Sequence, residues 1–105
     1  MYYTVASKMV IAASATAFTQ AVSMDGANAF MAEFTNFAAG NGTLYAVVGN
    51  DLENWGTLSG TMAIGAATYG TLAGTQIAAK FMRLRIQAAA GNPIILGSGI
   101  NTAAL

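Results

Sequence analysis

Hydrophobic and polar residues alternate with a period of two along much of the chain, and this period predicts β-strands. The alternation is clearest over residues 79–88, and it also runs through residues 27–34 and 43–48. Within residues 27–34, Phe30 and Phe34 fall on one face of the strand, and Glu33 falls on the other. We therefore expect one face of each strand to enter a core and the other to point outward.

Turn signals separate these segments. Ala39-Gly40-Asn41-Gly42 is a turn sequence, which predicts a hairpin between residues 27–34 and 43–48. Residues 50–54 interrupt the alternation, and residues 90–93 contain another turn signal, Asn92-Pro93. Short strands between turn signals predict an all-β fold, a single antiparallel β-sandwich with jelly-roll-like topology.

The first 23 residues allow more than one interpretation. Lys8 precedes an apolar run, residues 9–18, that resembles the hydrophobic region of a signal peptide. This run is too short for a membrane-spanning helix, which needs about 20 apolar residues. Its alanines permit a helix, but the Thr and Ser punctuation favours strands. We interpret residues 1–23 as structural, an extended N-terminal arm or edge strands, and residues 24–105 as the β-sandwich domain.

The composition bears on function more strongly than any motif does. Only 8% of the 105 residues are charged, against roughly 25% in average soluble proteins. Hydrophobic residues make up 55%, and the mean hydropathy is +0.53. A small domain with so little charge is expected to cover part of its surface by association with copies of itself or with a partner. The formal net charge of zero argues against nucleic-acid binding.

The chain contains few side chains that could act in catalysis. The chain has no histidine and no cysteine, which removes the commonest general base and nucleophile. No phosphate-binding loop or dense carboxylate motif occurs either. We expect a protein that is not an enzyme and that needs no cofactor or metal.

One loop groups the clearest candidate ligand-binding residues: Asp51, Glu53, Asn54 and Trp55. Two carboxylates are few for calcium, so a backbone-capping turn is the simpler interpretation of the first three. Trp55 is either a core anchor or a platform on which a sugar could stack.

Six residues are candidates for a subunit interface. Aromatic residues are enriched at interfaces, and Arg–carboxylate pairs fix the orientation of partners. The candidates are Tyr2, Tyr3, Met9, Ile11, Arg83 and Arg85. We expect the two arginines to pair with Glu33, Asp51 or Glu53, within or between subunits. The N-terminal arm is expected to reach a neighbouring subunit.

Two segments together carry a family resemblance. Gly-Asn-Asp-Leu-Glu-Asn-Trp at residues 49–55 is followed by Ala-Lys-Phe-Met-Arg-Leu-Arg-Ile at residues 79–86. The pair resembles small β-sandwich structural and decoration proteins of tailed-phage virions, including discoidin-like modules, over roughly residues 27–105. The resemblance implies a virion component with partners such as a major capsid protein. It does not imply an enzyme.

The sequence thus favours a non-enzymatic structural protein that assembles in many copies in or on a virion, most simply a capsid-decorating or minor structural protein. Its partners would be copies of itself and other virion proteins, with no nucleic acid or membrane bound. It would occur in the virion after assembly in the host cytoplasm. The alternatives are a carbohydrate- or surface-binding sandwich, and a non-viral shell or filament subunit located outside or on the cell.

Overall fold

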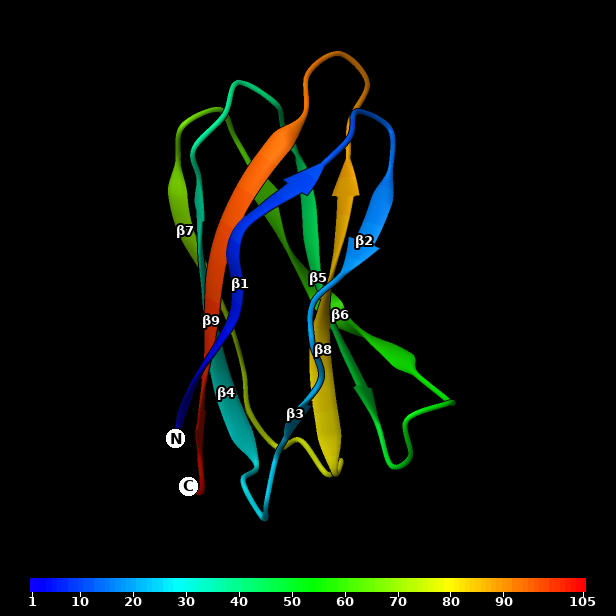
Figure 1. Cartoon of the computed structure of the whole chain (residues 1–105). Helices are drawn as coiled ribbons and strands as arrows, with labels where there is room; N and C mark the ends of the chain where they lie inside the picture. The colour runs from blue at the N-terminus through cyan, green and yellow to red at the C-terminus, as the bar shows by residue number, and fades with distance from the viewer.

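In a computed structural model that describes residues 1–105, the chain forms nine β-strands and contains no helix (Figure 1). The strands are β1 (Tyr2–Ile11), β2 (Thr16–Phe18), β3 (Val22–Ser23), β4 (Ala29–Asn36), β5 (Gly42–Gly49), β6 (Gly56–Ile64), β7 (Tyr69–Gly74), β8 (Phe81–Ala88) and β9 (Ile94–Ala103). The structure therefore contains no helix that could span a membrane.

The strands form two antiparallel sheets that pack as a β-sandwich, which confirms the predicted fold class. One sheet has the order β1-β9-β4-β7, and the other has the order β2-β8-β5-β6, with β3 also paired to β8. This order is that of a jelly roll, in which most connections cross from one sheet to the other.

The predicted hairpin between residues 27–34 and 43–48 is wrong. The strands in question, β4 and β5, belong to different sheets. The turn at residues 37–41 therefore crosses the sandwich, and the backbone of Gly40 donates a hydrogen bond to the carbonyl of Pro93. The hairpin within one sheet is formed instead by β5 and β6.

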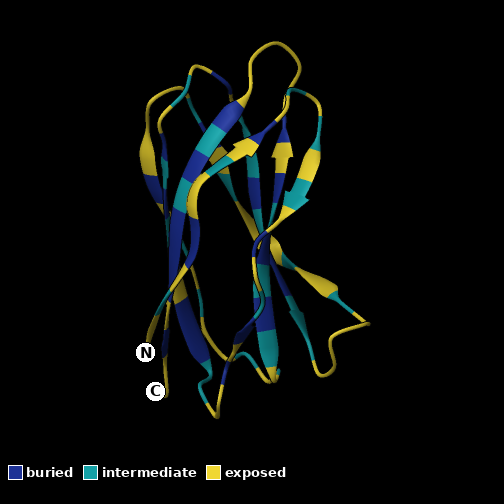
Figure 2. Cartoon of the chain, in the orientation of Figure 1, coloured by how far each residue is buried: buried dark blue, intermediate teal, exposed yellow.

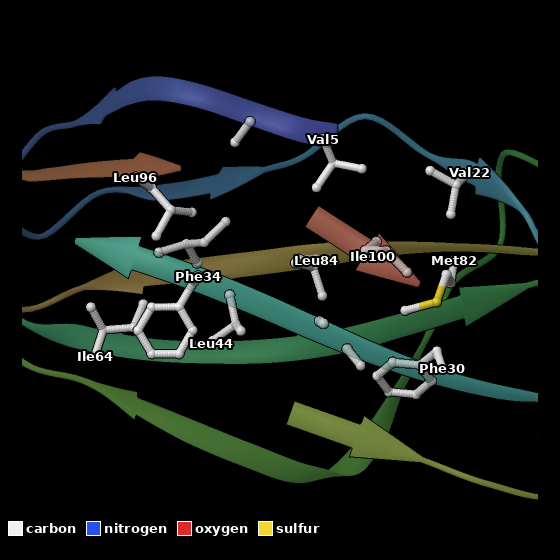
Figure 3. Close-up of a cluster of buried hydrophobic side chains, with 14 of the residues drawn as sticks. Val5, Val22, Phe30, Phe34, Leu44, Ile64, Met82, Leu84, Leu96 and Ile100 are labelled. Carbon is white, nitrogen blue, oxygen red and sulfur yellow. The ribbon is translucent and has the colours of Figure 1, made fainter. Parts of the chain in front are cut away.

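The core lies between the sheets and is filled by one face of each central strand. Phe30 and Phe34 on β4 point inward, as their shared face predicts, and both are buried (Figure 3). Ile100 on the neighbouring strand β9 and Leu84 on β8 of the opposite sheet belong to the same core cluster, and neither is exposed. In Figure 2 the buried colour accordingly runs along β4, β8 and β9.

Residues 1–23 lie within the sandwich. They form β1 at the edge of one sheet and β2 and β3 beside β8 in the other, and no part of them extends away as a free arm. Two register shifts in β1 accompany a left-handed backbone at Lys8 (φ 52°), and consecutive Val5 and Ala6 are both buried. Ile11 lies opposite Ile94 and is only 2% exposed.

Candidate interaction surfaces

The outer face of the β2-β8-β5-β6 sheet holds two arginines among aromatic rings; we call it the arginine face. The arginine face is defined by the side chains of Phe18, Tyr45, Trp55, Arg83 and Arg85. The Arg83 guanidinium carbon is 4.1 Å from the centroid of the Phe18 ring and 4.3 Å from that of Trp55. The Arg85 guanidinium carbon is 4.1 Å from the centroid of the Tyr45 ring. Such cation–π contacts hold the guanidinium groups in defined positions.

Strand register explains this arrangement. Tyr45 on β5 and Phe18 on β2 are the two cross-strand neighbours of Arg85. Trp55 ends the connection between β5 and β6, and its indole N–H donates to the carbonyl of Leu52 at 3.3 Å. Arg83 therefore stacks against rings from a separate strand and from the loop.

Neither arginine is neutralised within the chain. The Nε atoms of Arg83 and Arg85 are buried and have no hydrogen-bond partner, and no carboxylate lies within ion-pairing distance of either side chain. The within-subunit pairing with Glu33, Asp51 or Glu53 that the sequence suggested does not occur. Glu33 lies on β4, in the opposite sheet, and therefore faces away from the arginines.

The outer face of the other sheet is centred on Glu33, and we call it the glutamate face. Tyr2 on β1 donates a hydrogen bond to Glu33 Oε1 at 2.6 Å, and Tyr69 on β7 donates to Oε2 at 3.1 Å. These hydrogen bonds are the main reason that the pKa of each tyrosine is raised above its ordinary value. The Tyr2 ring lies over Gly99 of β9, where any side chain would collide with the hydroxyl group.

Large apolar side chains surround Glu33 on this face. Met31 precedes it by one outward position on β4 and is 45% exposed. Phe37 is 57% exposed and lies beside Gly97, and Tyr69 is 62% exposed. The outward-facing residues of β4, β7 and β9 include no other charged side chain, and the one basic residue of this sheet, Lys8, is exposed on edge strand β1. This face is therefore apolar and aromatic, with one acidic group at its centre.

The loop at residues 50–55 is held by a capping carboxylate. Asp51 Oδ1 accepts hydrogen bonds from the backbone amides of Glu53 at 2.9 Å and Asn54 at 2.7 Å, and Oδ2 accepts one from Asn54 Nδ2 at 3.0 Å. These contacts lower the pKa of Asp51, and the backbone amide of Asn54 contributes most. Glu53 is exposed and forms no ion pair or hydrogen bond with the arginines. One face of the Trp55 ring is covered by Arg83.

The candidate interface residues of β1 differ in accessibility. Tyr2 is 54% exposed, whereas Tyr3 and Met9 are half-buried against the core. Ile11 is wrong as an interface residue, because it is buried inside the subunit. Sequence patterns did not identify Glu33 as the centre of a surface, and they did not identify Phe18 or Tyr69 as surface-site residues. Their neighbours lie on distant strands, and no local pattern links them.

No known protein-family model matches the sequence, and no curated protein matches it. Among solved structures, the PBSX exported protein XepA is similar over 100% of this chain and 37% of its own (TM-score 0.79, 11% identity). The SPBc2 prophage-derived protein YomS is similar over 96% of this chain and 92% of its own (TM-score 0.55, 7% identity). A subunit of Bacillus endospore appendages, which are disulfide-linked pili, is similar over 100% and 82% respectively (TM-score 0.54, 14% identity).

These likenesses show a shared β-sandwich fold with phage-derived proteins and with a pilus subunit. The chain spans little more than a third of XepA. Identities this low establish fold alone, because one architecture serves many functions. The chain has no cysteine, so it lacks the means of disulfide linkage found in the appendages.

Proposed function

We propose that this protein is a non-enzymatic structural subunit that assembles in many copies, as a component in or on a phage-type virion. The observation that carries the proposal is the character of the two outer sheet faces. Each is rich in apolar and aromatic residues, and the charged groups near their centres, Glu33 on one face and Arg83 and Arg85 on the other, form no ion pair within the chain. Association would cover this apolar area and supply the missing counter-charges.

The structural comparisons support an association with phage-derived and self-assembling proteins, but they do not identify a binding partner. Two of the similar folds are phage-derived proteins, and a third belongs to a subunit of pili. In the finer form of the proposal, the protein decorates a capsid or forms a minor part of the virion. It would be assembled in the host cytoplasm and would contact copies of itself and a major capsid protein.

The mass of the purified protein in solution tests the proposal. We expect light scattering after size-exclusion chromatography to give multiples of the 10.7 kDa subunit that increase with protein concentration. Electron microscopy of the same fractions should show regular particles or stacks. A 10.7 kDa monomer at every concentration, in low and in physiological salt, would contradict self-assembly.

A further inference from the structure

The unpaired charges lie near the centres of opposite faces of the sandwich. Glu33 is on β4, which is flanked by β9 and β7. Arg83 and Arg85 are on β8, which is flanked by β2 and β5. Since the two sheets pack through their inner faces, the acidic and basic centres point in opposite directions from one subunit. They cannot meet within a subunit, but they can meet between two.

We propose that copies of this chain stack face to back, with Arg83 and Arg85 of one copy binding Glu33 of the next. This inference rests on the proposed self-assembly and specifies the contact that carries it. The partner is a second copy because the central charges of the two faces have opposite signs, and both faces have the aromatic surface that such a contact would bury.

The groups on the two faces are able to bind one another. Tyr2 and Tyr69 each occupy one acceptor site on a different oxygen of Glu33, and each carboxylate oxygen keeps a further lone pair. The Arg83 guanidinium group lies against the rings of Phe18 and Trp55 with its Nε buried, so its terminal Nη groups are the ones left to donate to a partner. A guanidinium and a carboxylate form paired, charge-assisted hydrogen bonds in this geometry.

The contact is also of a suitable size. The molecule measures 39 × 24 × 22 Å, so its broad face covers about 900 Å², close to the ~800 Å² that each partner buries in a stable interface. Arg, Trp and Tyr near the centre of an interface are the residues that most often carry its binding energy. Met31 and Phe37 would add apolar area around the central pair.

A face-to-back contact uses two different surfaces, so it is heterologous. Such a contact continues from copy to copy as an open stack, or closes into a ring. Two inter-sheet spacings of ~10 Å, one inside the subunit and one between subunits, give a repeat of roughly 20 Å along the stack.

Two neutralised variants test the contact. Glu33→Gln removes the charge of the glutamate face, and Arg83→Gln with Arg85→Gln removes that of the arginine face. We expect each variant to need at least ~10-fold more protein for half-assembly, because a desolvated charge loses its partner. Asp25→Asn and Lys80→Gln are matched controls, since both residues are exposed and lie in loops outside the faces. They should assemble like the wild-type protein.

An equimolar mixture of the two variants tests whether the arginine face of one copy binds the glutamate face of another. The glutamate variant keeps its arginine face, and the arginine variant keeps its glutamate face, so the mixture can form one native contact per pair. We expect light scattering to give a 1:1 complex of two subunits that does not grow further. A mixture that stays monomeric would contradict the face-to-back contact.

The remaining outcomes separate this inference from the proposed function. If the wild type assembles and Glu33→Gln assembles equally well, the contact lies elsewhere and self-assembly stands. If the wild type is monomeric, both proposals fail. Circular dichroism confirms that each variant is folded; should the double arginine variant unfold, the nearly isosteric Glu33→Gln decides the question alone.

Discussion

The ring of Phe34 lies directly against the backbone of Gly70, its cross-strand neighbour on β7. A Cβ atom at position 70 would lie 2.6 Å from Cζ and 2.7 Å from Cε1 of that ring. Gly74, four residues further along β7, stands in the same relation to Phe30. Glycines on the edge strand thus provide the space in which the two largest core rings pack.

Gly70→Ala is therefore expected to destabilise the fold. Phe34 is only 1% exposed, so its ring has no open space into which it could move. Overpacking of this kind costs about 1–3 kcal/mol. Urea unfolding followed by circular dichroism measures the change. Gly56→Ala, on edge strand β6 with only Val48 O at 4.0 Å, is the control that should unfold like the wild type. Equal stability of the two variants would contradict the packing argument.

Neighbouring residues on β1 test whether the N-terminal segment belongs to the core. Ile11 is 2% exposed and Val10 is 68% exposed. Ile11→Ala should lower the free energy of unfolding by about 2–5 kcal/mol, because it leaves a cavity beside Ile94. Val10→Ala should change it by no more than about 0.5 kcal/mol. A free arm would instead make both changes neutral, and thermal or urea unfolding distinguishes the two results.

Period-two alternation predicts which side chains of β4 enter the core, whereas on β1 the register shifts bury the consecutive residues Val5 and Ala6. Phe30 and Phe34 point inward and Glu33 outward, as their positions indicate, because successive residues of a strand alternate between faces. Alternation carries no information on which sheet a strand joins. For this reason β4 and β5 were wrongly paired across a turn that in fact crosses the sandwich.

The candidate surfaces were predictable only in part, for the same reason. Arg83 and Arg85 are conspicuous in a chain with four cations. Their aromatic neighbours come from strands far away in the sequence, and only the order β2-β8-β5 brings them together. Glu33 is likewise separated by 31 residues from Tyr2 and by 36 from Tyr69. Contacts of this kind depend on topology, which a single sequence leaves open.

The capped loop gives a prediction in the acid range. Asn54→Ala removes the side-chain hydrogen bond to Asp51 but keeps both backbone amides. The pKa of Asp51 should therefore rise toward its ordinary value without reaching it. A carboxyl group with a lowered pKa stabilises the folded loop above its unfolded pKa, and this contribution is lost as the pH falls through the folded value. Carboxyl NMR titration measures the midpoint.

A control separates the side-chain contact from a general change of charge in the loop. Glu53→Gln keeps the backbone amide that donates to Asp51, so the Asp51 midpoint should stay where it is in the wild type. A midpoint that does not move in Asn54→Ala would show that its side chain does not hold the carboxylate.

The glutamate face gives the corresponding prediction in alkaline solution. Glu33→Gln replaces the charged acceptor of Tyr2 and Tyr69, so the pKa of both phenols should fall toward the ordinary tyrosine value. In the wild type, the raised pKa stabilises the fold below the unfolded tyrosine pKa, and this contribution is lost as the pH rises through the folded value. Wild-type stability should therefore decline more than that of Glu33→Gln over this range.

Ring NMR titration of monomeric samples follows both phenols, with Glu53→Gln as the control that leaves them unchanged. Unaltered titration in Glu33→Gln would mean that the two tyrosines do not share this carboxylate in solution.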